Sequence, residues 1–142
     1  MSDLTELLER VKAATGPDKV LDRDILCIID GWTYEKRGRD RQPWMYGAKG
    51  ERRDPPGVGI FGAARPTSSI DAAVALVERK LPGCGYIIGM GRETPDEPLG
   101  ACAIYSSLSG EGAELAEEEA PTLPLAVLTA LLSALIAQGA SS

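Results

Sequence analysis

The chain has 142 residues, of which 44% are hydrophobic and 25% are charged, and its formal net charge is −6. This balance is typical of one folded globular domain, residues 1–142, and excludes an intrinsically disordered chain. The longest apolar stretch is too short for a membrane span, and the acidic N-terminus lacks the features of a signal peptide, so we expect a cytoplasmic protein.

Apolar spacing predicts a helix over residues 3–15, which Gly16 and Pro17 end, and a second helix over residues 18–30 with Asp18 as its N-cap. Asp22 and Asp24 lie two positions apart on that second helix, so their side chains point in different directions. We therefore expect both carboxylates on a solvated helix face, and no metal site.

Residues 35–65 differ from the rest of the chain, because they contain eight basic residues against four acidic ones and are rich in Gly and Pro. We predict a long, mobile, basic loop here. At its start, alternating aromatic residues favour a short hairpin with one aromatic face; these are Trp32, Tyr34, Trp44 and Tyr46. Residues 57–62 match GxGxxG, but no apolar strand precedes them and no helix follows directly, so we expect no cofactor.

In the second half of the chain, Ser68 and Asp71 resemble a capping box that begins a helix over residues 69–80. Residues 86–92 and 101–105 predict an antiparallel hairpin around the turn at residues 95–98. Residues 109–120 are strongly acidic, and we predict a mobile connection there.

Thr122 begins a last helix over residues 123–138 that is apolar almost all round, and we expect it at the centre of the core. With four helices and an antiparallel hairpin, the chain is predicted to be an α+β domain. Its three scattered cysteines, Cys27, Cys84 and Cys102, are expected to be reduced core thiols.

Three segments in this order resemble a known family: LLERV at residues 7–11 followed by TGPD at 15–18 and leading to Leu21 and Asp22, TSSIDAAVALV at 67–77, and APTLPLA at 120–126. They are similar to the small phage and prophage proteins grouped as the phage ABA-sandwich domain, over about half of the chain. The resemblance implies an α/β/α sandwich with a small, mainly antiparallel sheet, encoded by a phage or prophage and present in the host cytoplasm. It implies no reaction.

The chain has no histidine, which excludes Ser-His and Cys-His nucleophilic sites and the HExxH zinc motif. We therefore expect no enzymatic activity, no catalytic residue, no cofactor and no metal.

The expected function is that of a phage accessory protein that binds a macromolecular partner, such as an inhibitor or modulator of a host defence protein or another host protein. Cations that alternate with aromatic residues also suit nucleic acid, so nucleic-acid binding through residues 32–46 is the alternative. A homodimer is also compatible with the sequence. The candidate partner-binding residues are Trp32, Tyr34, Lys36, Arg37, Arg39, Arg41, Trp44, Arg52 and Arg53.

Overall fold

The computed structural model describes residues 3–39, 44–46, 52–53, 65–91, 94–107 and 112–139. The described part contains four helices and two three-stranded antiparallel sheets, ordered β1-β2-β3 and β4-β5-β6. The α+β class, the four helices and the antiparallel sheet are therefore confirmed. The elements are α1 (Asp3–Ala13), α2 (Lys19–Ile29), β1 (Thr33–Glu35), β2 (Trp44–Tyr46), β3 (Arg52–Arg53), α3 (Ile70–Lys80), β4 (Gly85–Met90), β5 (Gly100–Tyr105), β6 (Glu114–Ala120) and α4 (Leu123–Ala137).

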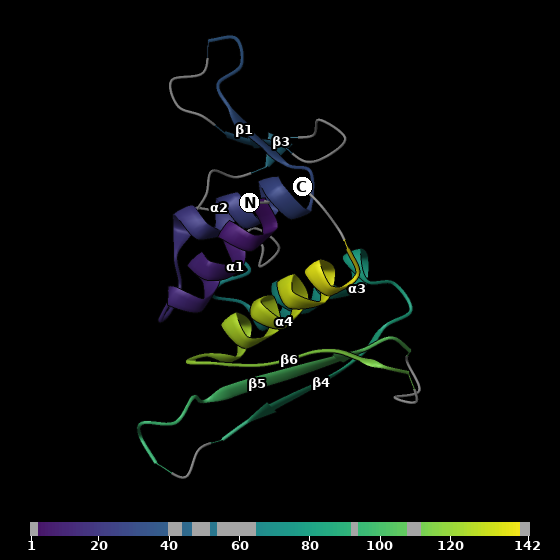
Figure 1. Cartoon of the computed structure of the whole chain (residues 1–142). Helices are drawn as coiled ribbons and strands as arrows, with labels where there is room; N and C mark the ends of the chain where they lie inside the picture. The colour runs from purple at the N-terminus through teal and green to yellow at the C-terminus, as the bar shows by residue number, and fades with distance from the viewer. Residues whose placement is uncertain are drawn as a thin grey trace.

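The elements form layers that Figure 1 shows edge on. The β4-β5-β6 sheet lies at one end of the molecule, α4 packs across it, and α1, α2 and α3 lie beyond α4. The small β1-β2-β3 sheet lies at the opposite end, next to α2. An α/β/α sandwich would place helices on both faces of its sheet, whereas all four helices of the described residues lie over one face of β4-β5-β6. No helix or strand of the described residues covers the other face of this sheet.

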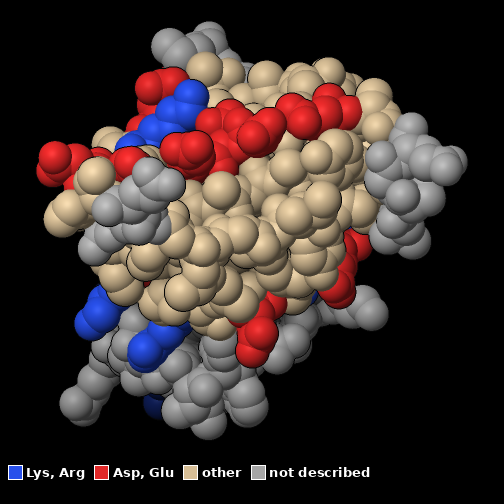
Figure 2. Space-filling view, turned by 90° about the horizontal axis from the view of Figure 1, so that it is seen from below, with Lys and Arg blue, Asp and Glu red and all other residues tan. Residues whose placement is uncertain are grey.

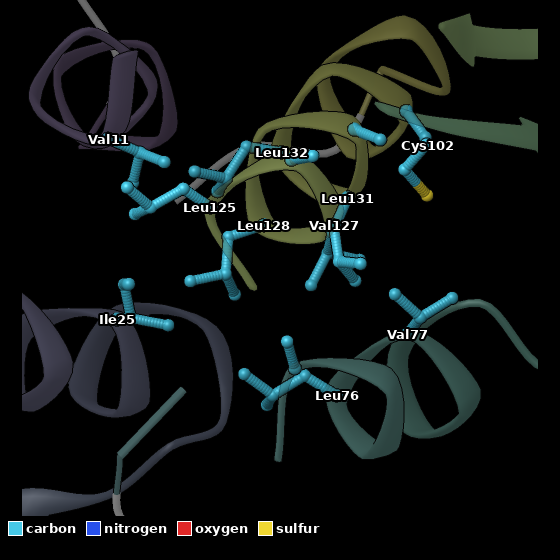
Figure 3. Packing of buried hydrophobic residues seen from close by; sticks show 14 of the residues in the cluster. Val11, Ile25, Leu76, Val77, Cys102, Leu125, Val127, Leu128, Leu131 and Leu132 are labelled. Carbon is cyan, nitrogen blue, oxygen red and sulfur yellow. The ribbon is translucent and has the colours of Figure 1, made fainter. Parts of the chain in front are cut away.

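Helix α4 is the centre of the core, as its sequence predicts. It packs on β5 and β6 with one side and on α1 and α3 with the other, so apolar residues are needed all round it. Figure 3 shows leucine and valine side chains of α4 pointing toward Val11 of α1, Ile25 of α2 and Leu76 of α3. No helix in the described parts of the chain is long and apolar enough to cross a membrane.

Three helices begin at side chains that accept a hydrogen bond from the backbone N–H three residues later. These N-caps are Asp18, Ser69 and Thr122. Asp18 and Thr122 are confirmed, but α3 begins at Ser69 where Ser68 was expected. Ser69 has the extended backbone of an N-cap and accepts from the N–H of Ala72, while the hydroxyl of Ser68 donates to the carbonyl of Arg65 at 3.2 Å.

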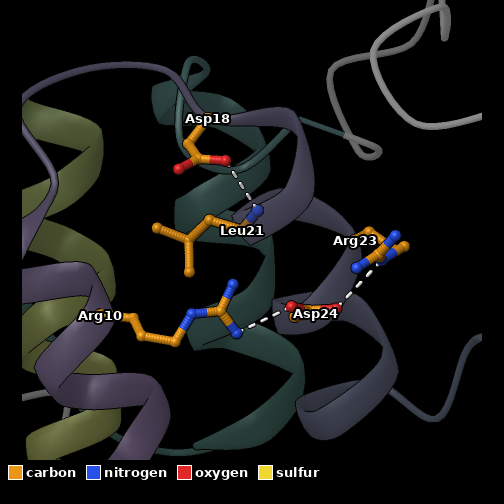
Figure 4. A network of polar contacts seen from close by, with 5 residues as sticks. All are labelled: Arg10, Asp18, Leu21, Arg23 and Asp24. Atoms are coloured by element: carbon orange, nitrogen blue, oxygen red, sulfur yellow. Dashed lines mark hydrogen bonds and ion pairs between the residues drawn. The ribbon is translucent and has the colours of Figure 1, made fainter.

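The first two helices are joined by an ion-pair network, which Figure 4 shows. Asp24 of α2 accepts hydrogen bonds from Arg10 of α1 at 2.7 Å and from Arg23 at 3.1 Å. Burial raises the pKa of Asp24, but the hydrogen bonds from the two guanidinium groups outweigh it and hold the pKa below its usual value. Asp24 therefore pairs α1 with α2.

Asp22 is only 2% exposed, so its expected place on a solvated face was wrong. One of its carboxylate oxygens accepts a hydrogen bond from the backbone N–H of Thr67 at 2.7 Å. The Thr67 hydroxyl in turn accepts from the N–H of Asp18 at 2.9 Å. Burial raises the pKa of Asp22, and the hydrogen bonds from Thr67 offset part of this effect. The hydrogen bonds of Thr67 with Asp18 and Asp22 thus hold the chain that precedes α3 against the start of α2.

The expected mobile connection over residues 109–120 was also wrong, because residues 114–120 form strand β6. Its side chains alternate between the two faces of the sheet, and Ala116 and Ala120 are buried against α4. Glu118 lies on the same side, where its carboxylate accepts a hydrogen bond from the hydroxyl of Ser133 at 2.9 Å. The acidic composition is tolerated because the other carboxylates of β6 face solvent.

Candidate partner-binding surfaces

The β1-β2-β3 sheet brings together most of the predicted partner-binding residues. Trp32 precedes β1, Lys36 follows it, Trp44 begins β2, and the backbone of Arg52 and Arg53 forms β3. The register pairs Arg52 with Tyr46, so the backbone of a basic residue six positions further along joins the aromatic segment. Arg41, and the side chains of Trp44, Arg52 and Arg53, lie outside the described residues, as does most of the predicted loop 35–65. We call residues 32–39 together with β2 and β3 the basic surface.

The aromatic residues of the basic surface do not share one face, contrary to expectation. The β1-β2 pairing itself is confirmed, but its register places Tyr34 opposite Met45. Tyr34 is 38% exposed, whereas Tyr46 is 5% exposed and buried. Neighbouring positions along a strand point to opposite faces, so the register separates these two rings.

Both tyrosine rings of the basic surface are covered by arginines of the same chain. The guanidinium carbon of Arg37 lies 3.6 Å from the centroid of the Tyr46 ring, and that of Arg23 lies 5.0 Å from the Tyr34 ring. Arg37 also forms a 2.7 Å ion pair with Glu35. These cation–π contacts and ion pairs fix the two guanidinium groups on the surface.

Trp32 anchors the basic surface to the helices, since its ring packs against the core and its indole N–H donates to Asp30 at 3.1 Å. Asp30 also pairs with Arg79 at 2.9 Å and with Lys80 at 3.1 Å, both at the end of α3. Burial raises the pKa of Asp30, but the hydrogen bonds from Arg79 and Lys80 outweigh it, so the pKa lies below its usual value. The surface is therefore fixed to α2 and α3.

The open face of the β4-β5-β6 sheet is a second candidate surface, which sequence reasoning missed. The register places on it the residues Ile87, Gly89, Ala101, Ala103, Tyr105, Glu117 and Glu119. Figure 2 views this face directly and shows a broad area without charge, crossed by a band of acidic residues. We call it the open sheet face. No sequence pattern predicted it, because its exposure follows from all the described helices lying on the other side.

Two shallow hollows lie side by side on the open sheet face, with volumes of about 450 Å³ and 270 Å³. Both are lined by Gly89, which has no side chain, and by Ala101, which has only a methyl group. Ile87 and Met90 stand at these hollows and are 63% and 68% exposed.

The described residues offer little for metal or thiol chemistry. Within the described ranges, no group of three or more Cys, Asp or Glu is placed to hold a metal ion. The three cysteines are free, and burial raises the pKa of the Cys102 thiol to about 11.

No protein-family model, curated protein or solved structure matches this chain.

Proposed function

We propose that the protein is a non-enzymatic accessory protein of a phage or prophage that binds an acidic surface of another protein through its basic surface. The observation that supports this best is the set of contacts that Arg37 and Arg23 make with Tyr46 and Tyr34. They hold cations in fixed positions on a surface anchored to the helices by Trp32. Preorganised arginines lose less conformational freedom on binding a carboxylate.

The same contacts favour a protein partner over a nucleic acid. Single-stranded nucleic acids bind through exposed aromatic rings on which bases stack. Tyr46 is buried, and Arg23 covers one face of the Tyr34 ring. Exposed Lys36 and Arg39 then supply charge, while the Tyr34 ring offers at most one face for stacking.

The proposed partner is a host protein with an acidic surface, and the accessory protein would inhibit or modulate it. The phage assignment rests on the resemblance of residues 7–22, 67–77 and 120–126 to the phage ABA-sandwich domain. We propose a host defence protein as the target. Charge complementarity between the two surfaces would raise the association rate even where it adds little affinity. Expression of the protein in a bacterium should then raise the plating efficiency of a phage that the targeted defence restricts.

Paired charge variants test the binding proposal directly. In the variant Lys36→Gln/Arg39→Gln two exposed cations of the basic surface are neutralised. The control Lys12→Gln/Lys19→Gln has the same net charge, and its lysines are exposed at the end of α1 and the start of α2, where their helix-dipole effects oppose each other. We expect a partner that wild type and control retain from host lysate in stoichiometric amount, and that the basic-surface variant loses. Equal retention by both variants would contradict the proposal.

Nucleic-acid binding is the second candidate, supported by the register that brings Arg52 and Arg53 beside β2. It predicts that labelled DNA or RNA shifts at low salt, that the affinity falls steeply as salt rises, and that joint replacement of Arg37, Arg39 and Arg41 abolishes the shift. A shift of this kind, in the absence of any protein partner, would replace the first proposal.

A further inference from the structure

Strand β4 is an edge of its sheet, and its composition differs sharply from that of the other edge. Edge strands expose unpaired backbone groups, and charged side chains commonly protect them from pairing with another chain. β6 has this protection in Glu114, Glu117, Glu118 and Glu119. β4, with the sequence GYIIGM, has no charged residue, and in the described structure its only neighbouring strand is β5. Its edge is therefore unprotected.

The register shows which backbone groups of β4 point outward. The N–H of Gly91 donates to the carbonyl of Leu99, just beyond the strand ends, so this is a hydrogen-bonded pair. Hydrogen-bonded and non-hydrogen-bonded residue pairs alternate along an antiparallel ladder. Ile87 and Gly89 consequently bond to β5, while the N–H and C=O groups of Tyr86, Ile88 and Met90 point to the free edge.

We propose that β4 pairs with β4 of a second copy of this chain, antiparallel and centred on Ile88, to form one continuous six-stranded sheet. In this register Ile88 faces Ile88 of the second copy, and Tyr86 faces Met90. Every outward backbone group from Tyr86 to Met90 then finds a partner, giving about six hydrogen bonds. A register centred on Ile87 would leave the outward groups of Met90 beyond the facing strand, so it forms fewer.

Side-chain shape also fits the register centred on Ile88. It places the exposed Ile87 of each copy opposite Gly89 of the other, on the open sheet face. A Cβ atom built on Gly89 meets nothing within 4 Å, and both hollows are lined by this glycine. The exposed Ile87 side chain thus enters space that Gly89 leaves open, which is the kind of complementarity that a two-fold interface requires.

Charge favours this arrangement as well. Pairing through β4 leaves the two glutamate-bearing β6 strands at the outer edges of the six-stranded sheet, where their like charges are farthest apart. The basic surface lies at the opposite end of each copy, so pairing and partner binding do not compete (Figure 1). Dimerisation through β4 is therefore independent of the proposed function.

The first test is the mass of the protein in solution, measured by light scattering during size-exclusion chromatography. We expect a dimer for the wild type and a monomer for Ile87→Lys, which places a charge at the paired edge. The matched control is Val20→Lys, because Val20 is another exposed aliphatic residue, 50% exposed on α2; it should remain a dimer. A wild type that is monomeric throughout the micromolar range, or an Ile87→Lys variant that stays dimeric, would overturn the proposal.

Cysteine cross-linking tests the register. Residues in a non-bonded antiparallel pair have Cα atoms about 4.5 Å apart, within the range of a disulfide. A mixture of Ile87→Cys and Gly89→Cys should therefore form a covalent dimer on oxidation, whereas each variant alone, and the wild type with its own three cysteines, should not. Cross-linking of Ile87→Cys with itself, or none in the mixture, would refute the register.

Discussion

Gly100 is the position at which strand β5 passes closest to helix α4, and its substitution tests how the sheet is held. A Cβ atom at Gly100 would lie 2.9 Å from the Cα and N atoms of Leu123 and from the carbonyl oxygen of Thr122. All three are backbone atoms at the start of α4, so no side-chain rotation relieves the overlap. At Gly89, in the neighbouring strand, the added Cβ meets nothing within 4 Å.

These distances give the size of the expected effect. Ordinary van der Waals contact begins at 3.4 Å, so Gly100→Ala must push the start of α4 from β5 by about 0.5 Å. Because nine residues of α4 are buried, such a shift disturbs the centre of the core, and we expect a loss of about 1–3 kcal/mol in the free energy of unfolding. Gly89→Ala should instead gain up to about 1 kcal/mol, by reducing the freedom of the unfolded chain.

Urea denaturation followed by tryptophan fluorescence measures both changes. Both substitutions are made in the Ile87→Lys background, so that self-association does not enter the comparison. For a chain of this size the expected loss corresponds to a fall in Tm of about 3–10 °C, which thermal denaturation checks independently. If Gly100→Ala and Gly89→Ala unfold at the same urea concentration, the close approach of β5 and α4 does not constrain the fold as argued.

Three further predictions follow from the core and the ion pairs. Leu128 is fully buried in α4, so Leu128→Ala should lower the free energy of unfolding by about 2–5 kcal/mol. Leu135 of the same helix is only partly buried, so Leu135→Ala should lower it less in the same urea assay. Because folding lowers the pKa of Asp30, the ionised carboxylate contributes to stability above its unfolded pKa, and this contribution disappears as the pH falls through the folded pKa. The urea midpoints of wild type and Asp30→Asn should therefore differ at pH 7 and converge below pH 3.8, the unshifted value. A difference between the two midpoints that stays constant with pH would contradict this. Cys102 is buried and has a pKa of about 11, so it should resist iodoacetamide at pH 8 in the native protein and react in urea. The half-buried Cys27 and Cys84 should react sooner in the native protein. Mass spectrometry of the labelled peptides measures all three reactions.

The helices could be predicted from the sequence because their signals are local. Apolar spacing and the caps Asp18 and Thr122 place α1, α2 and α4 within a few residues of their observed bounds. Strand β6 could not be predicted, since Glu and Ala are both poor strand formers and three consecutive glutamates suggest a solvated linker. What makes it a strand is its pairing with β5 and the cover of α4, and neither is visible locally.

The candidate surfaces show the same limit. The charge and aromatic content of the basic surface could be predicted, but not the pairing of its arginines with Tyr34 and Tyr46, which depends on how α2 lies beside β1. Asp22 and Asp24 were expected in similar environments, although Thr67, far along the chain, buries one of them. The exposed edge of β4 depends on strand order, which a single sequence does not state.

Helix α2 holds both ends of the segment that contains the basic surface. At its C-terminal end, Asp30 binds Trp32 and the end of α3; at its N-terminal end, Asp18 and Asp22 bind Thr67. The 11 residues of α2 set these attachment points about 16 Å apart. The free energy of closing a loop between fixed ends grows only slowly with loop length. A change in the length of the segment between them therefore costs little free energy, as long as these two attachments to α2 are kept.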